Sequence, residues 1–305
     1  MTKISCIGAG NLGAVIAYEI ASRGIVDEIV LVDILKDLAE GQAADIQQAL
    51  PFQNKTKVYF GDYPALTNSD VIIIAAGKPR TPDIKDRLQL AEINIKIVGS
   101  IVQEIKKYSP HSIIITLTNP MDFINHFIYT QGFAREKVIG SGGQLDSSRF
   151  RIALGFPEKE VEGYVLGEHG DDQVPLFSGV TIDGKKKEFS EEEKKEMRDR
   201  IRKTSSTVIQ KKGATVFAPA SNTADMVEAI LNGQKKLMIC SINLHEEYGL
   251  TDVSLGVPVI LGRKGIEKIE EWLLNKQELQ QLHMAAEKLK TAYAQCTLSF
   301  TKKDL

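Results

Sequence analysis

The stretch Gly8-Ala9-Gly10-Asn11-Leu12-Gly13 decides the fold of this chain. It follows a short apolar run, residues 4–7, and precedes a segment of helical character that extends to Gly24. G-x-G-x-x-G between a strand and a helix is typical of a turn that binds dinucleotide phosphates. The first glycine permits the tight turn, the second admits the phosphates to the backbone, and the third lets helix and strand pack closely. Free N–H groups at the start of the helix favour the same ligand.

A carboxylate stands at the end of the next predicted strand. Residues 28–32, Glu-Ile-Val-Leu-Val, are followed by Asp33, which lies twenty positions after Gly13. At that place an acidic side chain accepts hydrogen bonds from the ribose hydroxyls of an adenosine and repels a 2′-phosphate. The pattern therefore predicts NAD as the cofactor, in preference to NADP. The alternative is an aspartate that caps the strand beside a structural glycine turn.

Predicted strands and helices alternate through the first half of the chain. Helices are expected over 36–49 and 88–108, and strands over 58–60, 71–75 and 113–116. Because these strands are largely apolar, we expect a buried parallel sheet covered by helices, which is the Rossmann-type doubly wound α/β fold. Ligands bind at the carboxyl ends of such strands. The residues at those ends are Gly8, Asp33, Gly77 and Asn119.

Length and composition indicate a globular protein with two closely packed domains or one large α/β unit. The 305 residues are 43% hydrophobic and 26% charged, and the formal net charge of -2 provides no broad basic field for nucleic acid or an anionic membrane. We predict an NAD-binding Rossmann domain over residues 1–142 and a mixed α+β substrate-binding, catalytic domain over residues 143–305. The active cleft is expected between them.

Targeting and metal-binding patterns are not found in the sequence. An apolar run long enough to span a bilayer is missing, and so is a secretory signal, so we expect a cytoplasmic protein. The cysteines lack the paired spacing of zinc or redox motifs, and the histidines other than His169 show no helical pairing, so no metal is expected. Cys6, inside an apolar strand, is expected to be a packed thiol. The residues concerned are Cys6, Cys240, Cys296, His111, His126, His245 and His283.

Two segments carry arginines that can reach a ligand. Residues 78–87 contain two prolines and mixed charge, which predicts a surface loop over the cofactor crevice, with Arg80 and Arg87 as candidate ligand contacts. A solvated charged loop is the alternative. Farther along, Asp146 and Arg149 are three positions apart on a predicted helix, so both can point into one cleft or form a surface ion pair.

One histidine follows a predicted strand directly. The run 163–167, Gly-Tyr-Val-Leu-Gly, stops in Glu168-His169-Gly170, which places an imidazole beside two glycines. Histidine titrates near neutral pH, and the glycines allow close approach of a substrate. His169 is therefore a candidate acid/base, unless local hydrogen bonds satisfy it.

The motifs occur in the order seen in the lactate and malate dehydrogenase family, which the chain resembles essentially from end to end. The glycine turn with Asp33 and the two-arginine loop come first, followed by Thr118-Asn119-Pro120-Met121-Asp122, Leu145-Asp146-x-x-Arg149 and Gly167-Glu168-His169-Gly170-Asp171. Within the family the chain is most similar to the archaeal-type, lactate-dehydrogenase-like malate dehydrogenases. That likeness is carried by residues 167–178 and by Lys212-Gly213-Ala214-Thr215.

The resemblance implies hydride transfer between NAD(H) and a 2-hydroxy acid. His169 would exchange the proton, and Asp146 would orient its imidazole and stabilise the charged form. Arg149 would hold the C1 carboxylate of the substrate, and Arg87 would polarise the reacting carbonyl. The implied substrate contacts are Arg80, Arg87, Asn119, Arg149 and Thr215. The implied cofactor contacts are Gly8, Gly10, Asn11, Leu12, Gly13, Asp33, Gly77, Asn94, Leu117 and Asn119.

Arg80 sets the expected substrate. In this family glutamine at the corresponding position suits the methyl group of pyruvate, and arginine suits the second carboxylate of oxaloacetate, so the resemblance implies a malate dehydrogenase that works as a homodimer or homotetramer. Thr215 occurs in both lactate and malate enzymes and does not discriminate. From Gly77 to Arg87 the loop is one residue longer than the usual pattern, which leaves open which arginine contacts which oxygen.

Three alternatives are weighed against this function. An L-lactate or broader L-2-hydroxy acid dehydrogenase differs only in substrate. A catalytically silent NAD-binding module would need the glycine turn and Asp33 but not Asp146, Arg149 and His169 together. An NAD-dependent glycoside hydrolase would need metal-binding cysteine and histidine near the cleft.

Overall fold

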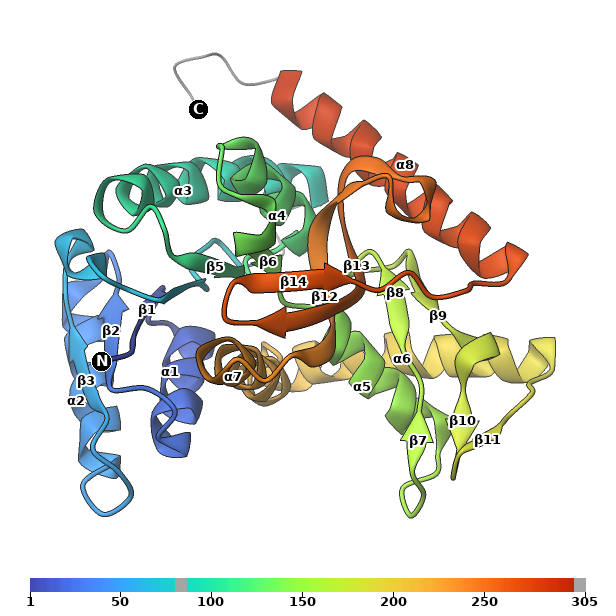
Figure 1. Ribbon diagram of the computed structural model, residues 1–305, viewed down its shortest axis with the longest axis horizontal. Helices are drawn as coiled ribbons and strands as arrows, with labels where there is room; N and C mark the ends of the chain where they lie inside the picture. Colours follow the sequence, from blue (N-terminus) through green and yellow to red (C-terminus); the bar gives the residue numbers. More distant parts are fainter. Residues whose placement is uncertain (80–86, 299–305) are drawn as a thin grey trace.

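The computed structural model describes residues 1–79 and 87–298. Arg80 lies outside these residues, so its place in the site stays a prediction. The strands are β1 (Lys3–Ile7), β2 (Glu28–Val32), β3 (Lys57–Phe60), β4 (Val71–Ile74), β5 (Ile113–Thr116), β6 (Val138–Gly140), β7 (Val161–Glu162), β8 (Val165–Gly167), β9 (Gln173–Pro175), β10 (Thr181–Ile182), β11 (Lys185–Lys186), β12 (Lys236–His245), β13 (Thr251–Gly262) and β14 (Gly265–Ile269). The helices are α1 (Asn11–Arg23), α2 (Lys36–Ala49), α3 (Arg87–Tyr108), α4 (Met121–Thr130), α5 (Gly143–Leu154), α6 (Glu191–Lys212), α7 (Phe217–Asn232) and α8 (Lys276–Leu298) (Figure 1).

The first half of the chain forms a parallel sheet in the order β3-β2-β1-β4-β5-β6. In this register Ile7 lies beside Val32 of β2 and beside Ile74 of β4. Strands β4 and β5 are buried along their whole length, as expected where helices cover both faces. The strand order reverses at β1 and β4, so the carboxyl ends of these strands flank the crevice where ligands bind. The predicted Rossmann-type doubly wound fold is confirmed.

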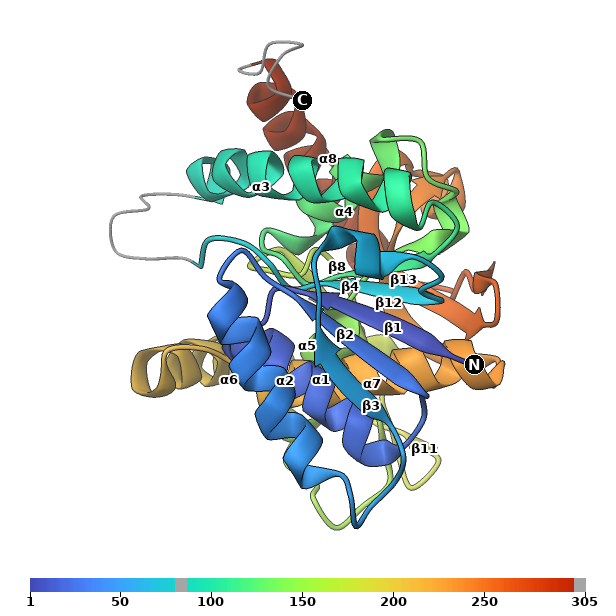
Figure 2. The same cartoon turned by 90° about the vertical axis from the view of Figure 1, so that its left-hand side faces the viewer.

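Helices α1 and α2 lie on one face of this sheet, and α3 and α4 lie on the other (Figure 2). Successive residues of β4 point to opposite faces: Ile73 packs in the cluster that contains Ile16 of α1, and Ile72 packs in the cluster that contains Ile95 of α3. Burial of each such side chain stabilises the fold by about 1.5–3 kcal/mol. This packing holds the N-termini of the helices beside the carboxyl ends of the strands.

The same sheet continues into the second half of the chain. Gly140 of β6 pairs with Ser241 of β12, and the order then runs β12-β13-β8-β9 with antiparallel pairing. β14 pairs with β13, and a separate small sheet has the order β11-β10-β7. β8, whose following turn carries His169, therefore lies in one sheet with the dinucleotide-binding strands. This mixed architecture is the one expected for the second half.

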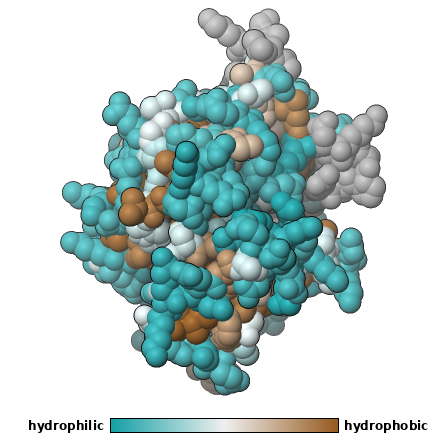
Figure 3. Space-filling view, turned by 90° about the vertical axis from the view of Figure 1, so that its right-hand side faces the viewer, coloured by the Kyte–Doolittle hydropathy of each residue, from teal (hydrophilic) through white to brown (hydrophobic). Residues whose placement is uncertain are grey.

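The surface of the second half is largely polar. A capping box starts α6, because the Glu193 N–H donates to Ser190 Oγ at 3.2 Å and the Ser190 N–H donates to Glu193 Oε2 at 2.7 Å. Ile201 of this helix is buried, whereas Ile209 is 52% exposed. Hydrophilic side chains dominate the face seen in Figure 3. Within the described parts of the chain, no helix combines the length and apolarity needed to cross a membrane.

Candidate active site

The His169 imidazole meets helix α5 just beyond the end of β8. His169 Nδ1 lies 2.6 Å from Asp146 Oδ2, and Arg149 Nη1 donates to Asp146 Oδ1 at 3.0 Å. The Asp146 side chain is only 3% exposed, the Arg149 side chain 13% and the His169 side chain 17%. The i,i+3 ion pair of Asp146 and Arg149 thus exists, but it is buried against the histidine instead of lying on the surface. Because Nδ1 faces the carboxylate, Nε2 is available to a substrate atom.

Charges around the imidazole raise the pKa of His169 above its ordinary value. Burial alone would lower the pKa, but the charge and hydrogen bond of Asp146 and the charge of Asp122 act in the opposite direction and outweigh it. Arg149 opposes them. The imidazolium therefore persists to higher pH than in an exposed histidine, as a proton donor at neutral pH requires.

A second carboxylate holds the backbone of His169. The His169 N–H donates to Asp122 Oδ2 at 2.6 Å, and Asp122 is 3% exposed in the first turn of α4. Asp122 occurs in the family motif, but the sequence patterns predict no role for it. This contact ties the end of β8 to the segment that follows β5.

Arg87, the first residue of α3, reaches the same turn. Its guanidinium forms an ion pair with Glu168 and lies against Gly170, which are the two residues that flank His169 in sequence. The Arg87 side chain is 42% exposed, whereas that of Glu168 is 11% exposed. The predicted catalytic arginine is therefore close to the histidine and is paired with a carboxylate that the sequence patterns do not single out.

The glycine turn has the shape that dinucleotide phosphates require. Gly8 has φ +101°, and a Cβ there would lie 2.5 Å from the backbone N of Ala76. A Cβ at Gly13 would lie 1.8 Å from the Gly8 carbonyl oxygen, so helix and strand could not pack with a larger residue. A Cβ at Gly10 would meet nothing within 4 Å, which leaves room for a phosphate beside the start of α1.

Asp33 closes this turn from the end of β2. Its Oδ2 accepts the N–H of Ala9 at 2.7 Å, and its Oδ1 accepts the N–H of Leu35 at 2.9 Å. Each oxygen keeps a further lone pair for a hydroxyl group. Asp33 therefore supports the glycine turn, as expected of a strand-capping aspartate. It also presents an acceptor that suits the hydroxyl groups of a ribose.

The remaining predicted contacts surround the ends of β4 and β5. Asn94 is fully buried, and its Nδ2 donates to the Asn119 carbonyl at 2.7 Å while its Oδ1 accepts the Lys78 N–H at 2.7 Å. It thus braces the two loops that border the cofactor crevice. Leu117 is buried, whereas Gly77 and Asn119 are exposed at the strand ends. The hydroxyl of Thr215, between α6 and α7, is buried without a hydrogen-bond partner within the described residues.

The two parts of this site define a class of protein. The glycine turn and Asp33 fit the phosphates and ribose of a dinucleotide, and the buried Asp146–His169 pair fits proton transfer next to a guanidinium that can hold an anion. Together they describe a dinucleotide-dependent oxidoreductase.

Comparisons with known proteins identify the family. Models of the lactate/malate dehydrogenase NAD binding domain and alpha/beta C-terminal domain match residues 2–140 and 143–299. Malate dehydrogenase of Haloarcula marismortui is 43% identical over 301 residues, which cover 96% of this chain and 99% of the relative. The structure of malate dehydrogenase from Archaeoglobus fulgidus in complex with NADH has a TM-score of 0.90 at 32% identity, covering 97% of this chain and 100% of that one. Lactate dehydrogenase from Cryptosporidium parvum, complexed with lactic acid and NAD, has a TM-score of 0.92 at 31% identity, covering 98% and 99%.

The chain belongs to the lactate/malate dehydrogenase family. The predicted family, the NAD-dependent oxidoreductase class and NAD as the cofactor are thereby confirmed.

Proposed function

We propose that the chain is an NAD-dependent malate dehydrogenase, which interconverts (S)-malate and oxaloacetate. The observation that carries this proposal is the buried Asp146–His169 contact with Arg149 beside it, in the sheet that also forms the dinucleotide turn. The choice of malate is supported by the archaeal relatives that are named malate dehydrogenase and by Arg80 in the loop before α3.

His169 carries the proton. When bound, NADH supplies the hydride that the carbonyl carbon of the 2-oxo acid receives. The His169 imidazolium donates its Nε2 proton to the carbonyl oxygen, and in the reverse direction neutral His169 accepts the proton of the hydroxyl group. Asp146 keeps the Nδ1 proton in place and favours the charged ring through both steps. One proton and one hydride thus convert the ketone into the alcohol.

Three arginines bind and polarise the substrate. Arg149 holds the C1 carboxylate, since a guanidinium can contact both oxygens of one carboxylate. Arg87 leaves Glu168 when substrate enters and faces the carbonyl oxygen, where negative charge develops during hydride addition. Arg80 pairs with the C4 carboxylate, and a methyl group in that place would leave its charge without a partner.

The cofactor contacts follow from the strand ends. The turn of Gly8, Gly10, Asn11, Leu12 and Gly13 binds the diphosphate, and Asp33 binds the adenosine ribose. Gly77, Asn94, Leu117 and Asn119 border the nicotinamide half, where Asn119 also adjoins the substrate. Thr215 offers its unpartnered hydroxyl to the substrate.

Three further expectations accompany this proposal and stay predictions. They are the division into domains at residues 1–142 and 143–305, the cytoplasmic location, and assembly into a homodimer or homotetramer. Sedimentation of the purified protein tests the last of them.

A substrate panel tests the function. We expect kcat/KM with NADH to be roughly a hundredfold or more higher for oxaloacetate than for pyruvate, because a cation built to pair with a carboxylate rejects a methyl group. The variant Arg80→Gln should move this ratio toward pyruvate, and Arg80→Lys, which keeps the charge, should move it less. A wild-type preference for pyruvate would instead support an L-lactate or broader L-2-hydroxy acid dehydrogenase.

A further inference from the structure

Asp122 is placed where a carboxylate can act on His169 through its backbone. It comes from the first turn of α4, and its Oδ2 accepts the His169 N–H at 2.6 Å. The two residues are 47 positions apart, so this contact results from the tertiary structure and not from their closeness in sequence. The hydrogen bond fixes the backbone from which the imidazole projects.

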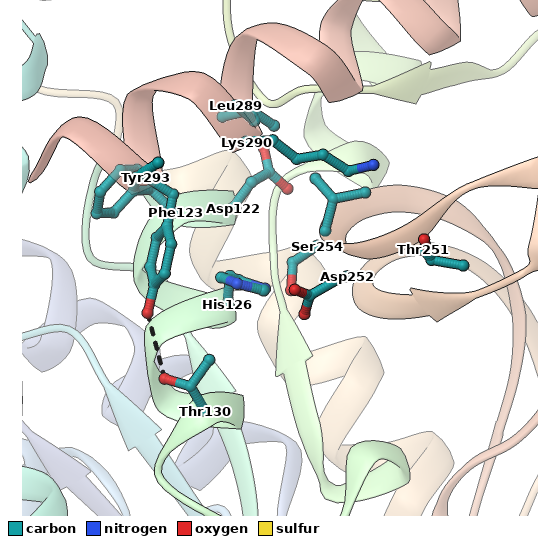
Figure 4. A pocket seen from close by; sticks show the side chains of 12 residues that line it. Asp122, Phe123, His126, Thr130, Thr251, Asp252, Ser254, Leu289, Lys290 and Tyr293 are labelled. Atoms are coloured by element: carbon teal, nitrogen blue, oxygen red, sulfur yellow. Dashed lines mark hydrogen bonds between the residues drawn. The ribbon is translucent and has the colours of Figure 1, made fainter. Parts of the chain in front are cut away.

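A cavity of about 370 Å³ lies on the other side of Asp122 (Figure 4). It is bounded by α4, β13 and α8, and its charged or titratable side chains are Asp122, His126, Asp252, Lys290 and Tyr293. Burial lowers the pKa of His126, so its imidazole is neutral near pH 7, and Lys290 forms an ion pair with Glu287 at 3.2 Å. Within the described residues, no positively charged side chain on this wall forms an ion pair with Asp122.

The Asp122 carboxylate has little solvent to stabilise its charge. Burial raises its pKa to about 7, while the Ser241 hydroxyl, the His169 N–H and the charge of the His169 imidazolium oppose that rise. Glu168 adds to it by like-charge repulsion. The pKa of His169 is also raised, and each of the two groups favours the charged form of the other.

The charged groups around His169 come from four parts of the fold. Asp146 and Arg149 belong to α5, Asp122 belongs to α4, Arg87 belongs to α3, and Glu168 belongs to the turn itself. Arg87 and Glu168 neutralise one another as an ion pair, and Arg149 and Asp146 form another. Among the residues that the structure describes, Asp122 is therefore the one carboxylate of this group without an arginine partner.

We propose that Asp122 is a positioning residue for His169, fixing the strand-end backbone and adding a second negative charge that holds the proton on the imidazole. This inference rests on the proposed role of His169 as proton carrier. It assigns to the Asp122 carboxylate a part in setting the pH range of the reaction, distinct from the direct contact that Asp146 makes with the ring.

The test is the variant Asp122→Asn in the full-length protein. The asparagine Oδ1 can still accept the His169 N–H, so the backbone contact is kept and the charge is lost. We expect the pKa of His169, followed by NMR of its ring protons and assigned with His169→Asn, to fall by about 0.5–1 unit, since a single charge at this range has an effect of that order. With NADH and oxaloacetate, the alkaline limb of kcat/KM should move to lower pH by a similar amount.

Asp252→Asn is the matched control, because Asp252 lines the same cavity and has a φ of +54°, which asparagine tolerates. It should leave both pH profiles unchanged. If Asp122→Asn does not fold, Ser241→Ala replaces it. This variant keeps the Asp122 carboxylate but removes the hydroxyl that favours its charge. The pKa of His169 is then expected to fall by a smaller amount.

An unchanged His169 pKa in the folded variant, or a fall in kcat at all pH values without a shift of the limb, would overturn the proposal and show a purely structural role. The NMR titration needs no substrate. Failure of wild-type protein to turn over oxaloacetate would therefore refute the proposed function separately.

Discussion

Nδ1 of His169 lies 2.6 Å from Oδ2 of Asp146, and the second oxygen of the same carboxylate accepts a hydrogen bond from Arg149 at 3.0 Å. One buried carboxylate thus orients the proton-carrying ring and the anion-binding guanidinium together. Asp146 therefore sets both where the proton is delivered and where the substrate carboxylate is bound.

Replacing Asp146 by asparagine should affect both rate and pH dependence. Loss of the Asp146 charge leaves the charge of Asp122 alone to oppose burial and Arg149, which lower the pKa of His169, so the imidazolium is lost at lower pH. The alkaline limb for oxaloacetate reduction should move downward, and kcat/KM at neutral pH should fall by roughly 10²–10⁴-fold. Asp62→Asn, at an exposed ion pair with Lys36, is the control and should retain wild-type kinetics.

The variant His169→Asn should be unable to carry the proton but should still bind the cofactor. We expect kcat to fall by roughly 10²–10⁴-fold, whereas NADH binding, measured by fluorescence titration, stays within about twofold of wild type. Rates close to wild type would show that His169 is not the acid. Undetectable turnover in the wild-type protein itself would favour the silent NAD-binding module.

Arg149→Lys tests how the substrate carboxylate is held. Lysine keeps the charge but cannot contact both carboxylate oxygens with a planar pair of donors, so KM for oxaloacetate should rise roughly tenfold or more. Arg151→Lys is the matched control two positions along α5, where the guanidinium donates to the Gly163 carbonyl and packs on Tyr164. Equal effects of the two changes would argue against a substrate contact by Arg149.

Asp33→Ser should weaken the discrimination between cofactors. Removal of the carboxylate abolishes repulsion of a 2′-phosphate, so the ratio of kcat/KM for NADPH to that for NADH should rise roughly tenfold or more. Some loss of stability is also expected, because Asp33 accepts the Ala9 N–H, and thermal unfolding measures it separately. A ratio that stays constant would mean that Asp33 only supports the turn.

Local patterns predicted most of the site. The glycine turn, Asp33, the Asp146–Arg149 spacing and His169 at a strand end are features of short segments, and their chemistry depends on residue type and neighbours in the chain. The parallel sheet followed from apolar strands that alternate with helices. β12 was not predicted, because a long and largely apolar run such as residues 237–244, interrupted only by Ser241 and Asn243, does not by itself distinguish a buried strand from a buried helix.

Contacts between distant segments could not be predicted in this way. Asp122 stands in the first turn of a helix, where an acidic residue is normally solvated and stabilised by the helix dipole. Its burial against the His169 backbone depends on how α4 lies relative to the turn that follows β8, which sequence spacing does not show. The pairing of Arg87 with Glu168 likewise depends on the tertiary structure.

A crystal structure of the protein with NADH and an unreactive oxaloacetate analogue tests the central claim most directly. We predict His169 Nε2 within hydrogen-bonding distance of the oxygen on C2, Arg149 in two contacts with the C1 carboxylate, and Arg80 beside the C4 carboxylate. An imidazole that lies well outside hydrogen-bonding distance of that oxygen, in a complex with both molecules bound, would contradict the account.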